Sequence, residues 1–405
     1  MPGRSMGVPH QARHGREINT DCGNAQPSQP QHKSGHAQFT GLTREAKTSE
    51  RRIVHLYPRF RREILSLAAV VLAAAGPAPK PAGPPPVPAF TVAMPAAAPK
   101  DALRRILLKP YAAITGAALP DLAWDGASLD LLNPKPPATA PDLALLTGAQ
   151  VFAGCKAQTL ARLDWARLNR DRFLQSLTSD CGAGALVAAS GLAWDKDKLN
   201  FTPSWADFWD IARHPGRRAL QRSVRGNLEF ALLADGVSPG DIYRTLRTPD
   251  GLDRAFRKLD QIKPYLVWWD KPEQPAQMLA AGRVLLTSSP TATVLLAATA
   301  AHRHFGVQWT GSLMEAYFWA VPVHAPQPGN SALALLVATD PARLAEMAAA
   351  TGLGPPTRDA LLLLPKAASD ATPSANLAAG LVVDEGFWAD NQAKLEPRFQ
   401  AWLSK

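Results

Sequence analysis

Residues 204–270 constrain the fold more than any other segment of this 405-residue chain. The segment holds four of the eleven tryptophans and two helices whose ends are marked by capping residues. Thr248 followed by Pro249 is typical of a helix start, because proline at the first helical position loses no hydrogen bond. Asn227 is expected to cap the preceding helix, which runs through Glu229 and ends at Gly236. We assign the tryptophans to packing, which predicts a compact, tryptophan-rich scaffold.

Short apolar segments alternate with helical ones from residue 89 onward. A helix is expected over Pro99–Thr115, ended by Gly116, and a second amphipathic helix follows Thr248. No internal repeat is visible, and no linker is long enough to separate independent domains. Strands that alternate with helices predict an α/β fold. The strand candidates are Phe90–Met94, Leu143–Leu146, Ala185–Ala189, Arg283–Ser288 and Phe318–Val323.

The first 62 residues carry most of the positive charge. They hold 11 Lys and Arg against 4 Asp and Glu, so only +3 of the formal net charge of +10 belongs to the rest of the chain. This distribution, without interleaved aromatic and basic residues, argues against nucleic-acid binding. Residues 1–50 are polar and are expected to form a disordered extension. We attribute the extension to a start site assigned too far upstream, with translation beginning near Val54.

An export signal is expected over residues 51–78. An arginine-rich stretch precedes the apolar run Ile64–Ala75, and small residues follow it. This order is typical of a secretory signal peptide, and the run is shorter than the ~20 residues that span a bilayer. The alternative, a buried core helix, is disfavoured by the proline-rich linker at 79–88. The pattern predicts a cleaved signal peptide and a periplasmic protein.

Cysteine usage agrees with export. Once the leader is removed, Cys155 and Cys181 are the only cysteines left. An oxidising compartment favours a structural disulfide between them, which stabilises the fold by ~3 kcal/mol in the chain-entropy model. Two free thiols, a metal pair or a catalytic cysteine are the alternatives. A metal pair is poorly supported, because no CxxC or HxxxH spacing accompanies either residue.

The sequence offers little support for an enzyme. It contains no GxSxG elbow, no P-loop and no dinucleotide-binding fingerprint, so no cofactor is expected. His302 and His304 are too close in sequence to share one face of a helix, which disfavours a metal site. A cysteine nucleophile would need one unpaired cysteine near a histidine. We therefore expect a protein that is not an enzyme and that holds neither cofactor nor metal.

Several segments resemble one known family. The module from Trp205 to Asp270 and the carboxyl-terminal run Asp384–Leu403 look like the extracellular solute-binding proteins of ABC transporters, in their spermidine/putrescine-binding branch. The resemblance covers essentially all of residues 90–405. Further matching segments are Lys109-Pro110, Thr115-Gly116, Trp124-Asp125-Gly126, Gly154-Cys155, Leu163-Asp164-Trp165, Ser179-Asp180-Cys181 and Phe318-Trp319-Ala320-Val321-Pro322.

The resemblance implies a two-lobed α/β fold of the periplasmic-binding-protein type, similar to its type II. Two crossovers would join the lobes, with the ligand held in the cleft between them and the hinge closing on binding. We assign residues 89–187 and 319–405 to lobe 1 and residues 188–318 to lobe 2. By the same analogy the partners are a small solute and an ABC permease in the membrane, and the protein is expected to be a monomer.

The sequence departs from this branch where the ligand should bind. A polyamine calls for carboxylates beside its ammonium groups and aromatic faces along its methylenes. An aromatic turn after the first strand is replaced by Met94-Pro95-Ala96, and an aromatic followed by Asn-Gly is replaced by Pro290-Thr291-Ala292. Tyr317 stands where the branch has a ligand-pairing Asp, and Thr147 stands at a second acidic position. These departures predict a divergent ligand pocket.

Two carboxylates and a few neighbouring residues are the candidate ligand contacts. Glu229 lies near a helix start, where the helix dipole favours an anion, and Glu315 falls just before the returning crossover. The alternative for Glu229 is an ordinary acid of the first helical turn, and the alternative for Glu315 is a solvated loop residue. Trp124 and Tyr317 are candidate cleft aromatics, although aromatic residues more often pack in cores. Ser289, which directly follows the strand expected over Arg283–Ser288, is the last candidate contact.

Three hypotheses for function follow. The first is a transport receptor for a small cationic or amine-bearing solute. The second is a receptor of the same fold whose pocket has changed to a different, less charged ligand. The third is a relative without a transport role that presents the scaffold to a protein partner. The lost acids and aromatics favour the second hypothesis over strict polyamine binding, while Glu229 and Glu315 support the first.

Overall fold

The computed structural model describes residues 89–96, 98–126, 128–135 and 139–405, all within one compact unit, Ala82–Lys405. The expected extension at 1–50, the signal peptide at 51–78 and the linker at 79–88 lie outside the described residues. None of the described helices has the length and apolar character that a membrane span requires.

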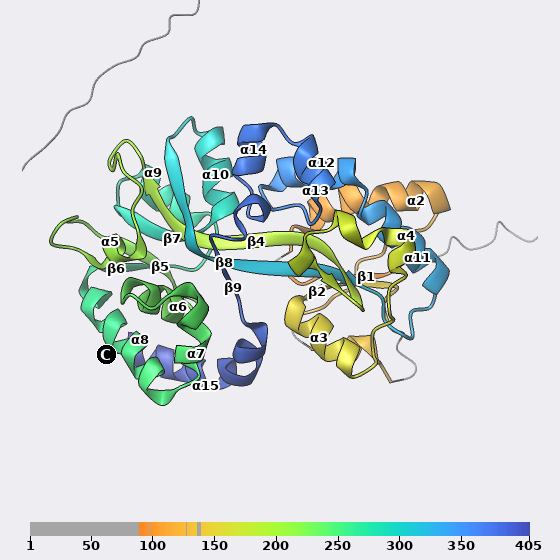
Figure 1. Ribbon diagram of the computed structural model, residues 1–405, viewed down its shortest axis with the longest axis horizontal. Coiled ribbons are helices and arrows are strands. Elements are labelled where there is room, and N and C mark those ends of the chain that lie inside the picture. The colour runs from red at the N-terminus through yellow and green to blue at the C-terminus, as the bar shows by residue number, and fades with distance from the viewer. Residues whose placement is uncertain (1–88, 97, 127, 136–138) are drawn as a thin grey trace, which may run out of the picture. The chain divides into compact units, whose positions relative to one another are not determined.

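A single mixed sheet of nine strands organises the unit (Figure 1). Its central order is β1-β2-β8-β4-β7-β5-β6, with β3 paired to β4 and β9 paired to β8. Strands β1 and β2 are parallel, as are β7, β5 and β6. Strand β4 is antiparallel to β3, β7 and β8, and β8 is antiparallel to β2 and β4 but parallel to β9. The strands are β1 (Val92–Ala93), β2 (Leu143–Thr147), β3 (Thr178–Ser179), β4 (Gly182–Asp195), β5 (Arg218–Gln221), β6 (Leu266–Trp269), β7 (Leu286–Pro290), β8 (Phe305–Ala320) and β9 (Leu381–Val382).

The two long strands β4 and β8 connect the two halves of the unit. They pair from Ala183 opposite Trp319 to Asp195 opposite Phe305, with register shifts near Gly184 and Ser190. The sequence predicted only short strands at Ala185–Ala189, which lies within β4, and at Phe318–Val323, which overlaps β8 only from Phe318 to its end at Ala320. Their glycine- and alanine-rich composition hides the strand length, because such residues carry little strand propensity. The two strands are the crossovers expected between two lobes.

Lobe 1 is built around one end of β4 and β8. Its core combines Phe90, which lies just before β1, with Leu143 of β2, Trp319 of β8 and Leu107 of the π-helical turn, all fully buried. The helix expected over Pro99–Thr115 runs from Lys100 to Thr115 and ends where Gly116 turns left-handed at φ 71°. The helices are α1 (Lys100–Ala102), the π-helical turn Leu103–Leu108, α2 (Lys109–Thr115), α3 (Gly148–Lys156), α4 (Trp165–Leu168), α11 (Pro328–Ala338), α12 (Pro341–Thr351) and α13 (Arg358–Leu363).

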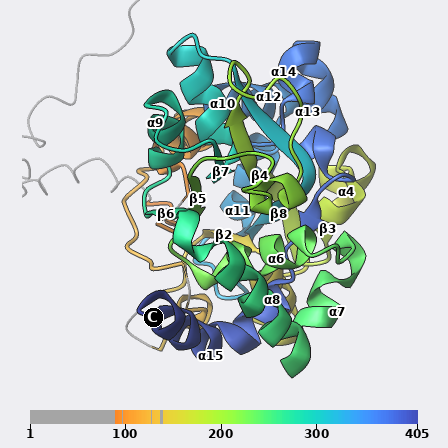
Figure 2. The ribbon, with the colours of Figure 1, turned by 90° about the vertical axis from the view of Figure 1, so that its left-hand side faces the viewer.

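Lobe 2 surrounds the other end of the long strands with β5, β6 and β7. Its larger core contains Trp194, Trp205 and Leu313 among its buried side chains. Thr248 caps α8 as predicted, since its side chain accepts the N–H of Gly251 and Pro249 opens the helix. Figures 1 and 2 show α10 on one side of the sheet and α6 and α8 on the other. The helices are α5 (Trp205–Trp209), α6 (Val224–Ala234), α7 (Ile242–Leu246), α8 (Pro249–Ile262), α9 (Gln274–Ala280) and α10 (Thr291–Ala300).

The chain passes between the lobes a third time near its end. After α14 (Lys366–Asp370), β9 pairs with the middle of β8, and α15 (Glu385–Leu403) then packs against α6. The sequence analysis assigned all of 319–405 to lobe 1, but Phe387, Trp388 and Trp402 belong to the core of lobe 2. Their aromatic side chains fill the space over α6 and α8, so the last helix is corrected to lobe 2.

A disulfide joins Cys155 to Cys181, with Cα atoms 5.7 Å apart. It links the end of α3 to the turn before β4, across 26 residues of sequence. This confirms the predicted pairing within lobe 1. Neither cysteine is therefore a free thiol or a metal ligand in this state.

Candidate functional site

The carboxyl ends of three parallel strands meet the middle of the two crossing strands. Strands β5, β6 and β7 end at Gln221, Trp269 and Pro290, and each end lies beside the same cavity. Ligands of open α/β sheets bind outside such strand ends. The cavity has a volume of about 480 Å³ and also touches Thr351 and Leu353 of lobe 1. Its polar lining consists of Ser190, Gln221, Ser223, Arg225, Asn227, Asp270, Ser288, Thr293, Glu315, Tyr317 and Thr351.

Arg225 is the central cation of this cavity. It follows β5 in the first turn of α6, where the backbone leaves helical geometry at Arg225 (ψ 131°) and at Gly226 (φ 92°). Its guanidinium donates to Glu315 of β8 (Nη2–Oε1, 2.9 Å) and to Glu385 of α15 (Nη1–Oε2, 3.0 Å). Burial alone would lower the pKa of Arg225, but the two carboxylates raise that pKa above its ordinary value. The guanidinium is therefore a permanent positive charge.

Glu315 and Tyr317 are the two sequence-predicted contacts that line the cavity. They lie two residues apart on β8 and on the same face of the strand. The phenolic oxygen of Tyr317 is 3.5 Å from Oε2 of Glu315. Burial, followed by the charge of Glu315, raises the pKa of Tyr317, so its hydroxyl stays protonated and remains a donor. The structure thus brings a carboxylate, a phenol and the guanidinium of Arg225 together at the crossover.

Glu229 does not line the cavity. Its side chain has an exposed fraction of 0%, and its carboxylate accepts three protein hydrogen bonds. Oε2 accepts from the Gly226 N–H (2.9 Å), while Oε1 accepts from the Tyr243 hydroxyl (2.9 Å) and the Trp388 indole (2.8 Å). Burial raises the pKa of Glu229, and the three donors and Arg225 oppose that rise. With its donors all from the protein, the carboxylate presents no free oxygen toward the cavity.

The remaining predicted contacts, Trp124 and Ser289, lie elsewhere. Trp124 lines a separate cavity of about 630 Å³ in lobe 1, and its indole donates to the carbonyl of Ser128 (2.9 Å). Ser289 is buried on β7, and its hydroxyl donates to the carbonyl of Pro290 (3.0 Å). Its neighbours Ser288 and Pro290 line the crossover cavity instead, because successive residues of a strand face opposite sides.

The sequence analysis missed most of the cavity lining, above all its cation, Arg225. Trp269 was assigned to packing and is indeed buried, with 2% exposure, in a core cluster, but β6 also ends at this residue, and its indole borders the cavity and donates to Ser288 (3.2 Å). Arg225 was passed over in favour of Glu229. The available signal was the pair Arg225-Gly226 a few residues after the short strand β5. A glycine at such a position allows a turn, and a turn after a strand can place the preceding side chain at the strand end. The expected cap Asn227 instead donates its amide to the carbonyls of Gln221 and Ser223 (both 2.8 Å).

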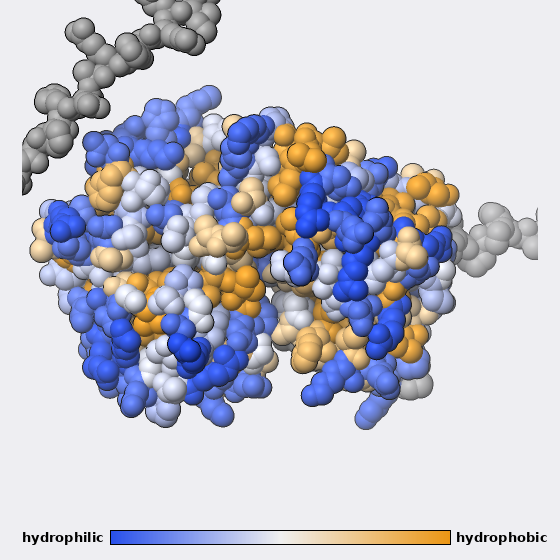
Figure 3. All heavy atoms as spheres, in the orientation of Figure 1, coloured by the Kyte–Doolittle hydropathy of each residue, from blue (hydrophilic) through white to orange (hydrophobic). Residues whose placement is uncertain are grey.

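A second cavity of about 540 Å³ lies on the side where α3 and α15 face each other. Phe152 of α3 is 71% exposed there, opposite the first turn of α15 with Glu385. Figure 3 shows the surface hollowed between the two lobes on this side. Glu315 lines both cavities, so the two meet at its ion pair with Arg225. This pair therefore lies at the centre of the cleft.

Within the described part of the chain, no group of three His, Cys, Asp or Glu side chains could hold a metal ion. The described acids around Arg225 are engaged with that arginine and do not converge on a common empty point. The arrangement can bind charged groups of either sign through hydrogen bonds and ion pairs.

Comparisons with known proteins agree with this architecture. A profile of the bacterial extracellular solute-binding protein family matches residues 123–375. A gamma-aminobutyric acid-binding protein of Pseudomonas aeruginosa is 36% identical over 268 residues, which are 65% of this chain and 76% of that protein. The residues that the family profile matches include both crossing strands and all of the cavity-lining residues between Ser190 and Leu353.

Solved structures share the fold at lower identity. The Atu4243 GABA receptor superimposes with a TM-score of 0.67 at 23% identity, covering 78% of this chain and 98% of that chain. A spermidine/putrescine substrate-binding protein from Streptococcus pneumoniae, solved with calcium and HEPES, has a TM-score of 0.61 at 15% identity and covers 78% and 99%. The likeness extends to receptors named for different solutes, so it establishes the two-lobed fold and leaves the ligand to the site itself.

Proposed function

The chain belongs to the bacterial extracellular solute-binding protein family, and we propose that it captures a small amine-bearing solute for the permease of an ABC transporter. The preferred solute class is a short ω-amino acid, with an ammonium group at one end and a carboxylate at the other. A γ-aminobutyrate-sized molecule suits a cavity of about 480 Å³ with room for solvent.

The observation that carries this proposal is the presence of both charges in one cleft. Arg225 offers a guanidinium, whose fork of donors matches a carboxylate. Glu315 on the crossing strand β8, paired with Arg225, and Asp270 after β6, paired with Arg222, are carboxylates whose remaining acceptor capacity can pair with an ammonium group. Tyr317 adds an aromatic surface, which favours an ammonium by ~0.5–2 kcal/mol per contact. A zwitterion uses both kinds of group at once.

The same charges disfavour a diamine. In the spermidine/putrescine branch that this sequence resembles, both ends of the ligand are ammonium groups, and an ammonium beside Arg225 would have to compete with that guanidinium for Glu315. Like charges in a partly buried cleft repel. The name of the Pseudomonas aeruginosa relative, a gamma-aminobutyric acid-binding protein, supports the zwitterionic class. A polyamine receptor with an altered pocket is thus the second choice.

Delivery follows from hinge closure around the solute. The two lobes are joined by β4, β8 and the passage through β9, and the Arg225–Glu315 pair lies where these strands cross the cleft. Small rotations in such connecting segments close the lobes of binding proteins over a ligand. Export by the signal at 51–78, a periplasmic location and a monomeric, non-enzymatic receptor are parts of the same proposal.

Titration calorimetry on the purified protein tests it with two matched probes. γ-Aminobutyrate and putrescine are similar in length and differ in one end group, a carboxylate or an ammonium. We expect γ-aminobutyrate to bind at least tenfold more tightly than putrescine, a difference of about 1.4 kcal/mol. Tighter binding of putrescine would favour the polyamine alternative, and binding of neither probe would reject a short linear amine as the solute.

A further inference from the structure

The first turn of α6 is bent at the residue that supplies the cation of the cleft. Arg225 has an extended ψ of 131° within a helix, and Gly226 follows with a left-handed φ of 92°. In a continuous helix the residue at 225 would point along the helix surface. The bend instead turns the guanidinium toward β8 and α15. A left-handed residue costs free energy unless its surroundings hold it, so the contacts of Gly226 matter for the placement of Arg225.

Glu229 supplies the contact that holds this bend. Its Oε2 accepts the N–H of Gly226 at 2.9 Å, one turn back along the same helix. Its Oε1 is in turn held by Tyr243 of α7 (2.9 Å) and by Trp388 of α15 (2.8 Å). A single buried carboxylate therefore joins the bend to two other elements of lobe 2.

The first turn of α15 reaches Arg225 by two routes. Glu385 binds the guanidinium directly, and Trp388, three residues later on the same face, binds Glu229. One route fixes the side chain of Arg225 and the other fixes its backbone. Burying a carboxylate is unfavourable compared with an apolar residue of similar size, so stability alone is a weak reason for an acid at this position.

We propose that Glu229, held by Tyr243 and Trp388, is a positioning residue that fixes the Arg225–Gly226 bend and thereby sets the affinity of the cleft for a carboxylate-bearing solute. This inference rests on the proposed function for its ligand. Glu229 acts through Arg225 and does not touch the solute. Its role differs from the direct contact that the sequence suggested.

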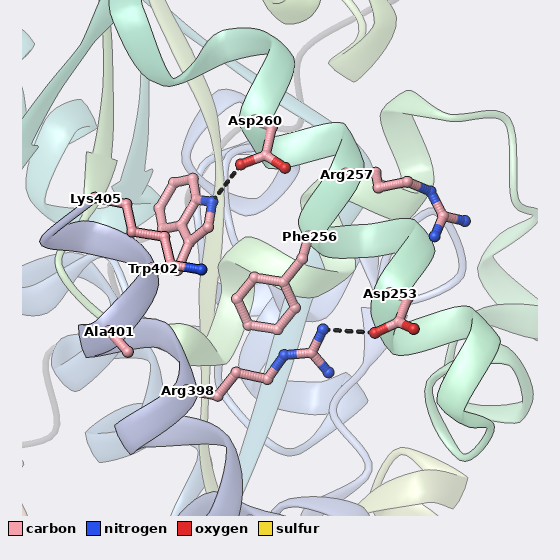
Figure 4. Close-up of a pocket in the computed structure, with 8 residues that line it drawn as sticks. All are labelled: Asp253, Phe256, Arg257, Asp260, Arg398, Ala401, Trp402 and Lys405. Carbon is pink, nitrogen blue, oxygen red and sulfur yellow. Dashed lines mark hydrogen bonds and ion pairs between the residues drawn. The ribbon is translucent and has the colours of Figure 1, made fainter.

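The chain contains a matched pair of tryptophans for the test. Both lie on α15, and each donates its indole N–H to a carboxylate: Trp388 to Glu229 at 2.8 Å and Trp402 to Asp260 at 2.6 Å. The second pair lies in a groove between α8 and α15, away from the cleft (Figure 4). Phenylalanine at either position keeps an aromatic ring and removes the donor. The two variants thus each remove one hydrogen bond from an indole N–H to a carboxylate, at two different places on α15.

We expect Trp388→Phe to weaken γ-aminobutyrate binding about tenfold, the effect of one lost hydrogen bond to a charged group. Trp402→Phe should leave the dissociation constant unchanged, even if both variants melt at similarly lowered temperatures. Tyr243→Phe removes the other donor to the same oxygen and should repeat the effect. An unchanged dissociation constant in both Trp388→Phe and Tyr243→Phe would overturn the proposal.

A second readout separates this proposal from the choice of solute. The ¹⁵N–¹H signals of the Arg225 guanidinium, identified by their loss in Arg225→Lys, report its ion pairs without any ligand. They should shift or broaden in Trp388→Phe and stay in place in Trp402→Phe. If the native chain binds no γ-aminobutyrate, the proposed solute is wrong, and these signals still decide the positioning role. Unshifted signals in Trp388→Phe would refute that role.

Discussion

Two hollows of the molecule each pair an arginine with a carboxylate beside aromatic rings, and they differ in where the fold places that pair. One is the cleft around Arg225, and the other is the groove around Arg398 between α8 and α15 (Figure 4). Their volumes are similar, about 480 and 430 Å³. In each, an arginine pairs with a carboxylate beside aromatic rings, and a tryptophan of α15 donates to an acid nearby.

The difference lies in the elements that converge. Arg225 is held by carboxylates from β8 and α15, at the ends of three strands and between two lobes. Arg398 pairs with Asp253 at 2.6 Å and lies 4.2 Å over the ring of Phe256, both on the adjacent helix α8. That pair joins two helices of the same lobe, so lobe closure does not reshape it. The comparison indicates that the candidate site differs from the groove in the elements that converge on its arginine, more than in the types of residue present.

Replacing the arginine of each hollow should give the largest difference in binding affinity between the two. Arg225→Met should weaken γ-aminobutyrate binding about 100-fold, because it removes the partner of the solute carboxylate and leaves Glu315 and Glu385 without theirs. Arg398→Met removes the same charge from the groove and should leave affinity within about twofold, since its exposed ion pair contributes little. Calorimetry on both variants measures the contrast. Equal losses would show that the groove contributes to binding.

Removing one acid from each hollow sharpens the contrast. Glu315→Gln should weaken γ-aminobutyrate binding about tenfold, because the ammonium group loses its charged partner at the crossover. The same variant should bind succinate, which has a carboxylate at both ends, more tightly than the native chain does. Asp253→Asn is the matched change in the groove and should alter neither affinity. Stronger γ-aminobutyrate binding by Glu315→Gln would mean that Glu315 competes with the solute for Arg225.

Local features of the fold could be predicted from the sequence. The Thr248 cap, the helix ending at Gly116 and the Cys155–Cys181 pair each depend on a few neighbouring residues or on a simple count, and the structure contains all three. The lobe assignment of α15 was wrong because an amphipathic helix does not specify which core it covers. The full lengths of β4 and β8 were missed because alanine and glycine have low strand propensity, so a segment rich in them does not predict a strand.

The site was harder to predict for a related reason. Arg225 meets its two acids across 90 and 160 residues of sequence, and Glu229 meets Trp388 across 159. An acid between Leu228 and Phe230 signals an unusual position, but only the fold shows that protein donors satisfy it. Glu315 and Tyr317 were found because two residues of one strand share a face whatever the tertiary structure.

The smallest expected effect concerns pH and compares the buried acid of the cleft network with an exposed acid of the groove. Burial raises the pKa of Glu229 above its ordinary value of 4.5 in the folded protein. Above pH 4.5 the folded state then binds more protons than the unfolded state, so the free energy of unfolding falls as pH rises through this window. Glu229→Gln removes the titration, and its melting temperature should therefore rise relative to that of the native chain as pH increases from 4.5 toward 7. Asp253→Asn, measured alongside, controls for the loss of one negative charge. A shift of the opposite sign for Glu229→Gln would mean that Gly226, Tyr243 and Trp388 stabilise the ionised carboxylate by more than its burial costs.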